Sequence, residues 1–152
     1  MFKHTIYSDK VIINAPIERV WEVLMDLPRY PEWNPFTYEV VPHDGSLYPG
    51  ANVDLYVRMP LRGDRVSTEK VARLEAPTQL AWGMTMINPW LLKAQRDQVL
   101  EKLDDNRCSY QTWDAFRGLL TPVVVGLFGK DMKNGFDGVA HALKKRCETA
   151  DD

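Results

Sequence analysis

The sequence is poor in the residues on which metal-binding, redox and disulfide-stabilised proteins depend. Its 152 residues include only two cysteines, Cys108 and Cys147, and their spacing matches no metal-binding or redox motif. We expect both thiols to be reduced and inert. The three histidines, His4, His43 and His141, fall in separate predicted elements. The sequence therefore predicts no metal site and no cofactor.

Long apolar runs and an excess of one charge are also missing. No apolar run is long enough to span a bilayer, and the first residues lack the apolar segment of a signal peptide. The chain has 19 Lys and Arg against 21 Asp and Glu, with a formal net charge of -2. No basic cluster alternates with aromatic residues, which argues against binding to nucleic acid. We expect a cytoplasmic protein without stable membrane insertion.

What is present is the composition of one globular domain. Hydrophobic residues make up 45% of the chain and charged residues 26%. A chain of this length can bury a core without metals or disulfides. It shows no repeat, low-complexity segment or linker. We therefore expect a single domain over residues 1–152, as a monomer or a homodimer.

The first part of the chain predicts a strand followed by two short helices. The β-branched residues 11–13 end the strand. Asn14 and Pro16 mark a helix start, as cap and first-turn residue, and apolar side chains at helical spacing continue to Leu24. The prolines that follow leave room for only one or two helical turns over residues 29–33.

Six further strands are expected, separated by Gly, Pro, Asn and Asp turn signals. They cover residues 36–42, 51–59, 65–75, 79–86, 93–103 and 107–116. In residues 51–59, Val53, Leu55, Val57 and Met59 alternate with polar residues, which is typical of a half-buried strand.

The last predicted element is a long amphipathic helix. Thr121 and Pro122 open it as cap and first-turn residue, and it continues to about Cys147. Its apolar stripe consists of Val125, Phe128, Met132, Phe136, Val139 and Leu143. It also contains Gly126, Gly129, Gly135 and Gly138, which are either tolerated by tight packing or leave room for a bound molecule. This order of elements favours an α+β fold in which a curved antiparallel sheet wraps around the helix.

Four segments resemble a known family. Residues 13–21 and 30–36 are similar to the N-terminal signature of the START-like (SRPBCC) superfamily, and residues 80–82 and 116–120 are similar to later parts of it. The nearest branch is the polyketide cyclase/dehydrase-like and lipid-transport group. The resemblance implies a helix-grip fold, as in birch-pollen-allergen-like proteins, with an internal cavity. It implies no shared set of catalytic residues.

The two strands before the long helix predict a register. If Asp104–Asn106 form a hairpin loop and Leu103 faces Arg107, then the paired residues are Leu100 with Tyr110, Gln98 with Thr112, and Arg96 with Asp114. Leu100, Tyr110 and Phe116 share this face, so we assign it to the concave side. A slip of one residue would reverse the assignment.

On this register Arg96 and Asp114 lie within salt-bridge distance on the concave face. They either fix the register as a buried pair or orient a polar end of a ligand. They lie near the end of the sheet where three apolar loops gather, at residues 59–61, 88–92 and 118–120. These loops either gate a cavity, or cap the core or form a dimer contact.

The leading functional hypothesis is binding of a small hydrophobic or amphipathic molecule between the sheet and the helix. The expected binding residues are Val53, Leu55, Val57, Leu80, Trp82, Met84, Arg96, Gln98, Leu100, Tyr110, Thr112, Asp114, Phe116, Phe128, Met132 and Phe136. One alternative is a metal-free enzyme of the cyclase or dehydratase type, with Asp114, Arg96 and Tyr110 as catalytic candidates. Another is an interaction protein that binds a partner through its apolar rim. Standard catalytic motifs are missing, which favours binding over catalysis.

Overall fold

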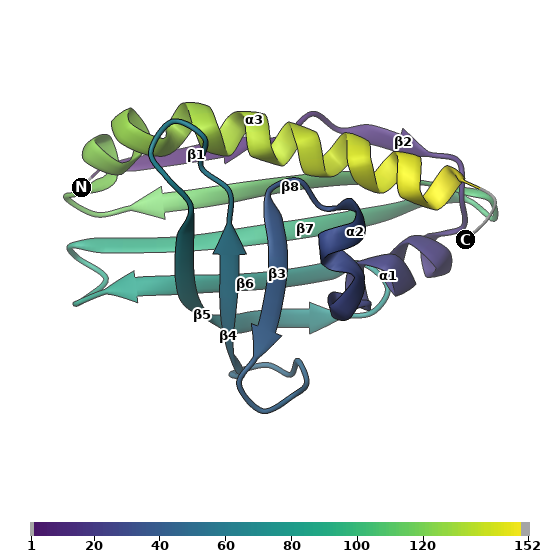
Figure 1. Cartoon of the computed structure of the whole chain (residues 1–152), viewed down its shortest axis with the longest axis horizontal. Helices are drawn as coiled ribbons and strands as arrows, with labels where there is room; N and C mark the ends of the chain where they lie inside the picture. Colours follow the sequence, from purple (N-terminus) through teal and green to yellow (C-terminus); the bar gives the residue numbers. More distant parts are fainter. Residues whose placement is uncertain (1, 150–152) are drawn as a thin grey trace.

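The chain folds into one curved antiparallel sheet and a long helix, as described by a computed structural model for residues 2–149 (Figure 1). The elements are β1 (Lys3–Tyr7), β2 (Val11–Ile13), α1 (Ile17–Met25), a 3-10 turn η1 (Leu27–Arg29), α2 (Tyr30–Trp33), β3 (Thr37–Pro42), β4 (Asn52–Val57), β5 (Arg65–Glu75), β6 (Gln79–Met86), β7 (Leu92–Asp104), β8 (Arg107–Arg117) and α3 (Thr121–Glu148). Within these residues the strand order is β1-β8-β7-β6-β5-β4-β3, and β2 pairs with β8 beyond β1.

The long helix α3 packs against β1, β2 and β8, and against the short helices α1 and α2. Figure 1 shows α3 running along the sheet, with α1 and α2 below its C-terminal half. The predicted apolar stripe faces inward: Met132, Phe136, Val139 and Leu143 are buried in the core, and Val125 and Phe128 are partly buried against it. The predicted helix-grip fold is confirmed.

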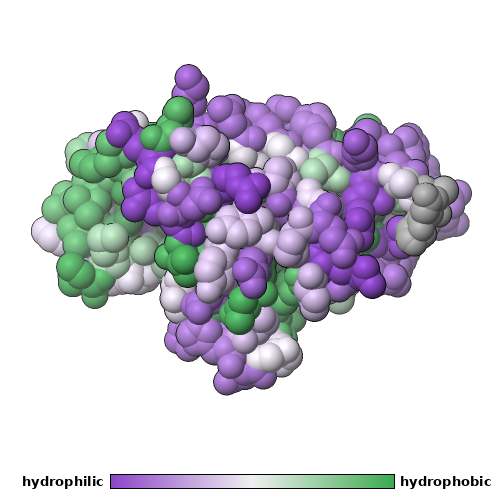
Figure 2. Space-filling view, in the orientation of Figure 1, coloured by the Kyte–Doolittle hydropathy of each residue, from purple (hydrophilic) through white to green (hydrophobic). Residues whose placement is uncertain are grey.

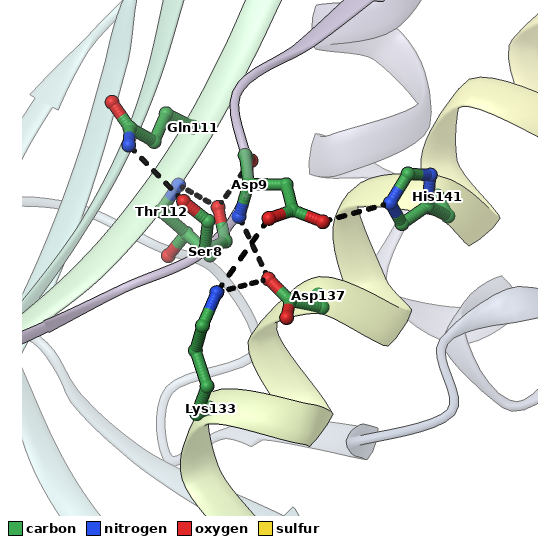
Figure 3. Close-up of polar contacts among 7 residues, drawn as sticks. All are labelled: Ser8, Asp9, Gln111, Thr112, Lys133, Asp137 and His141. Carbon is green, nitrogen blue, oxygen red and sulfur yellow. Dashed lines mark hydrogen bonds and ion pairs between the residues drawn. The ribbon is translucent and has the colours of Figure 1, made fainter.

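The N-terminal strand differs from the prediction, because it is broken at residues 8–10 into β1 and β2. A network of seven residues holds this break against α3 and β8: Ser8, Asp9, Gln111, Thr112, Lys133, Asp137 and His141 (Figure 3). The Asp9 backbone N–H donates to Asp137 Oδ1 at 2.7 Å, and the Asp9 carboxylate lies 3.2 Å from His141 Nε2. The Ser8 backbone N–H donates to the Thr112 carbonyl, and Ser8 Oγ accepts from the Thr112 N–H. The break therefore ties the first strand, the last strand and α3 together.

The predicted helix caps were wrong. Asn14 does not cap α1, because α1 begins after Pro16 and the Asn14 N–H donates instead to the Glu148 carboxylate at the far end of α3. Thr121 is the first residue of α3 rather than its cap, which is Leu120. Neither helix start has a side-chain cap hydrogen bond among the described residues.

The register between β7 and β8 matches the prediction along the part that matters for the site. Arg96 pairs with Asp114, Gln98 with Thr112, and Leu100 with Tyr110. The expected pairing of Leu103 with Arg107 was wrong. The ladder shifts by one residue between Lys102 and Asp104, so that Asp104 pairs with Arg107 and the turn contains only Asp105 and Asn106. This bulge lies at the turn, beyond the predicted pairs, so it leaves their faces unchanged.

Candidate functional site

A cavity of about 310 Å³ lies between the sheet and the N-terminal half of α3. Its wall includes ten of the sixteen predicted binding residues: Leu55, Val57, Trp82, Met84, Arg96, Asp114, Phe116, Phe128, Met132 and Phe136. The rest of the wall is formed by Phe36, Met59, Arg65, Val66, Ser67, Glu69, Met86, Leu92, Ala94 and Val124. Most of this surface is aliphatic, aromatic or thioether, which is the usual wall of a pocket for apolar ligands.

The other six predicted residues lie outside the cavity, in the solid core. They are Val53, Leu80, Gln98, Leu100, Tyr110 and Thr112, and all are buried. The Tyr110 hydroxyl donates to Gln98 Oε1 at 2.6 Å, and burial raises the pKa of Tyr110 to about 12. These residues lie on the predicted face of the sheet. They occupy parts of their strands that lie beyond the end of the cavity.

One end of the cavity is open to solvent, at the exposed wall residues Arg65, Val66 and Met86. Large apolar side chains are exposed on the neighbouring loops and on the first turns of α3: Leu61, Ile87, Trp90, Leu119, Val123 and Leu127. Figure 2 shows hydrophobic side chains gathered at this end, on the left of the view. The predicted neighbouring loops are joined directly, since the Leu119 N–H donates to the Trp90 carbonyl. The third loop packs on α3, where the Leu61 N–H donates to Asp131 Oδ2.

Arg96 is the cation at the inner end of the cavity, with only 5% of its surface exposed. Its Nε donates to Thr112 Oγ1 and its Nη1 to Thr37 Oγ1, both at 3.0 Å. The guanidinium carbon lies 4.7 Å from the centre of the Phe136 ring and 5.6 Å from that of Phe36. Two hydroxyls and two aromatic faces therefore fix the plane of the guanidinium, and its third nitrogen, Nη2, has no partner within residues 2–149.

The expected salt bridge between Arg96 and Asp114 was wrong. Although the two residues are cross-strand neighbours, Arg96 reaches past Asp114 to Thr37 on β3. Asp114 Oδ1 is buried and has no hydrogen-bond partner among the described residues. Burial, reinforced by the nearby charge of Glu69, raises the pKa of Asp114 to about 8 despite the opposing effect of Arg96. Asp114 is therefore largely protonated at neutral pH and gives Arg96 little counter-charge.

A second carboxyl group in the wall belongs to Glu69 on β5. It accepts a hydrogen bond of 2.9 Å from Ser67 Oγ, and burial raises the pKa of Glu69. Arg65, the other wall cation, lies at the mouth, with its guanidinium 5.0 Å from the centre of the Phe128 ring. The cavity is thus apolar except for one buried cation and two carboxyl groups that burial drives toward the neutral form.

The helix glycines do not open the cavity. A Cβ atom at Gly135 would overlap the Phe36 ring, and one at Gly138 would lie 3.2 Å from Pro35 Cγ. At these two positions the absent side chains admit the segment before β3, so that Phe36 packs edge-on against Phe136, with ring centres 5.3 Å apart. Of the two hypotheses for these two glycines, close packing of the chain is therefore the one the structure favours.

Other candidate groups lie away from the cavity. Cys108 and Cys147 are buried, free thiols, and burial raises their pKa values to about 11 and about 12. Within residues 2–149, no three His, Cys, Asp or Glu side chains gather in a geometry that could bind a metal ion. The helices in this part of the chain are too short or too polar to cross a membrane.

Comparisons with known proteins agree with this architecture. A family model described as polyketide cyclase / dehydrase and lipid transport matches residues 4–148, and no curated protein matches the sequence. A START superfamily protein from Mycobacterium smegmatis is 20% identical, covers 95% of this chain and 97% of its own, and has a TM-score of 0.67.

Two solved enzymes share the same architecture. The Zhui aromatase/cyclase from a Streptomyces species is 18% identical over 97% of this chain and 94% of its own, with a TM-score of 0.68. A norcoclaurine synthase mutant from Thalictrum flavum is 13% identical over 96% of this chain and 94% of its own, with a TM-score of 0.70. At these identities the likeness shows the START-like helix-grip fold.

Proposed function

The chain belongs to the polyketide cyclase/dehydrase and lipid transport family, and on that premise we propose that it binds a small hydrophobic molecule in the cavity beneath α3. The observation that supports this most strongly is the cavity itself. Its volume of about 310 Å³ is near the lower limit for small-molecule sites, and its wall is mainly apolar. Binding of an apolar ligand would remove the apolar surfaces of both the cavity and the ligand from water, which is favourable.

The test combines extraction of bound material with a variant that fills the cavity. Protein purified under native conditions is denatured and the released molecules are identified by mass spectrometry, while displacement of an apolar fluorescent probe measures affinity. Ala94 lies in the wall and is buried, so Ala94→Leu should fill part of the cavity and weaken probe binding at least about tenfold. Ala72→Leu, at an exposed position on β5, is the matched control and should bind as the wild type does. Equal binding by both variants would contradict the proposed site.

A second candidate function is catalysis of the cyclase or dehydratase type, in line with the names of two structural neighbours. It is favoured by Asp114, whose carboxyl group lies in the cavity wall with a pKa raised to about 8. A carboxylic acid that stays protonated at neutral pH can donate a proton to a leaving hydroxyl or a carbonyl oxygen. Arg96 could stabilise the developing negative charge. Tyr110, the third candidate, lies outside the wall and donates to Gln98.

Single-turnover assays separate the two functions. Asp114→Asn keeps the shape of the side chain but removes its acidic proton, so a binding protein should retain its ligand affinity at pH 7. An enzyme with Asp114 as general acid should retain affinity and lose turnover of a β-hydroxy carbonyl substrate by about a hundredfold or more. Absence of turnover by the wild-type protein across such substrates would leave binding as the function.

A further inference from the structure

The cavity wall contains buried polar atoms that have no hydrogen-bond partner within residues 2–149. Four buried polar side-chain atoms have no hydrogen-bond partner within residues 2–149, and two of these, Arg96 Nη2 and Asp114 Oδ1, belong to the cavity wall. They come from directly paired positions on neighbouring strands. A folded protein rarely leaves buried donors and acceptors unpaired, because each costs the free energy of its lost hydration. Two such groups at one place in a cavity point to a ligand that supplies the partner.

The positive charge of Arg96 at the inner end of the cavity indicates the chemical class of that ligand. The Arg96 guanidinium is a cation, and its hydrogen-bond partners, Thr112 and Thr37, are neutral. A buried cation without a counter-charge is costly. Asp114 offers only partial compensation, because burial favours its neutral form, and Glu69 accepts its hydrogen bond from Ser67 rather than from Arg96.

We propose that the ligand is an amphipathic molecule with a single anionic oxygen group of the carboxylate type, which Arg96 Nη2 and Asp114 bind at the inner end of the cavity. This inference rests on the proposed function and names its ligand class. Arg96 donates an N–H to the anionic group, and protonated Asp114 donates its O–H to the same group. The apolar part of the ligand then runs along Trp82, Met84 and Phe116 toward the mouth.

Other charged groups on the wall do not provide an equivalent site. The wall contains four charged or titratable side chains in the described part of the chain, namely Arg65, Glu69, Arg96 and Asp114. Arg65 lies at the mouth, where its Nη2 donates to the Arg62 carbonyl, and Glu69 already accepts from Ser67. The wall segments from α3, β4 and β6 contribute apolar side chains. The anion is therefore expected at Arg96 rather than at the entrance.

Matched ligands test this without any change to the protein. Binding of decanoate, decanol and methyl decanoate is measured by displacement of an uncharged apolar probe at pH 7. A charge-assisted hydrogen bond should favour decanoate over decanol by about tenfold or more. If decanol and the ester bind as well as the acid, the anionic site is refuted while the proposed function stands. If none of the three binds, the proposed function fails first.

Two variants locate the anion. Arg96→Gln should abolish the preference for decanoate, whereas Arg65→Gln, which removes the cation at the mouth, should retain it. Because Arg96 also bonds to Thr37 and Thr112, the fold of Arg96→Gln is checked by circular dichroism. Asp114→Asn tests the same site without changing Arg96, through the pH dependence of decanoate binding. If the preference depends on Arg65 and not on Arg96, the proposed location is wrong.

The pH dependence gives a readout that a merely structural role of Asp114 would not produce. Decanoate stays ionised from pH 7 to pH 9, but Asp114 loses its proton over this range and then repels the anion. Decanoate affinity should fall by about tenfold, since it follows the protonated fraction of Asp114. Decanol affinity should stay constant, and Asp114→Asn should bind decanoate with no such fall. A pH-independent decanoate affinity in the wild type would contradict the role assigned to Asp114.

Discussion

Arg96 lies directly across the β7–β8 ladder from Asp114, yet its guanidinium bonds to Thr112 beside it and to Thr37 on β3. The long side chain crosses the inner end of the cavity and stacks on Phe136. The short side chain of Asp114 stays in the wall with its Oδ1 unpaired. Two residues that the ladder pairs therefore make no ion pair with each other, and one buried polar atom of each has no hydrogen-bond partner among the described residues.

The first prediction concerns the coupling between these two residues. A buried ion pair would give a large coupling energy, about 3 kcal/mol or more, in a double-mutant cycle with Arg96→Met and Asp114→Leu. Because Asp114 is largely protonated below pH 8 and makes no ion pair with Arg96, we expect less than about 1 kcal/mol at pH 6. Urea unfolding of the four proteins measures it. A coupling energy of about 3 kcal/mol or more would instead indicate that Arg96 and Asp114 form an ion pair.

The second prediction is a pH dependence of stability caused by Asp114. Its pKa is raised in the folded protein from 3.8 to about 8, so between these values the folded state binds more protons than the unfolded state. Stability therefore falls as pH rises through this window. Asp114→Asn removes the titration and should gain about 3 kcal/mol relative to wild type between pH 6 and pH 9.

Asp105→Asn is the matched control for this experiment. Asp105 lies in the β7–β8 turn with 93% of its side chain exposed, so its replacement should change the stability profile little. Urea unfolding at pH 6, 7, 8 and 9 gives the comparison. Parallel profiles for wild type and Asp114→Asn would show that Asp114 has an ordinary acidity in the folded protein.

The third prediction concerns the hydroxyl that holds Arg96. Thr112 Oγ1 accepts from Arg96 Nε and donates to the Asp97 carbonyl at 2.7 Å. Thr112→Val keeps the volume but leaves the buried Arg96 Nε–H without an acceptor and removes one donor to the Asp97 carbonyl, which should lower the free energy of unfolding by about 1 to 3 kcal/mol. Thr112→Ser keeps the hydroxyl and should retain both hydrogen bonds. Equal effects of the two substitutions would mean that the methyl group, rather than the hydroxyl, is what matters.

The fourth prediction compares two glycines of α3. Alanine at either position raises helix propensity by about 1 kcal/mol. Gly126 has no atom within 4 Å of a built Cβ, so Gly126→Ala should stabilise the protein by up to that amount. At Gly135 the added methyl group would collide with the Phe36 ring, and Gly135→Ala should instead destabilise by about 1 to 3 kcal/mol. Thermal unfolding of both variants measures the difference, and similar melting temperatures would contradict it.

Much of this architecture follows from local patterns in the sequence. The parity of Leu100 and Tyr110 was enough to place Arg96 and Asp114 on the concave face, because alternation along a strand survives an error at the hairpin. The bulge at the turn changed only the pairing of Arg107. The apolar stripe of α3 predicted its buried face for the same reason, since helical spacing is a property of the chain alone.

What the sequence did not reveal depends on contacts between distant elements. Glu69 and Ser67 line the cavity, but they belong to a strand whose inward face is partly polar, so no apolar alternation marks them. Phe36 enters the wall only because Gly135 admits it. Thr37, on β3, accepts a hydrogen bond from Arg96 in place of the expected ion pair with Asp114. No local pattern in the sequence indicates this contact between distant strands. The boundary between solid core and cavity likewise depends on how closely α3 approaches the sheet.

The pairing of β1 with β8 has a consequence for how the chain is made. The first strand finds its ladder partner only in the last one, with Lys3 opposite Arg117, and the Ser8–Thr112 bonds span 104 residues. On the ribosome, residues 3–7 must wait without a sheet partner until almost the whole domain has been synthesised. Pairing of strands that are far apart in the sequence slows folding, because the conformational entropy of the chain is lost before the stabilising contacts form. The sheet is therefore expected to close on its β1 side only late in folding, after β8 has been synthesised.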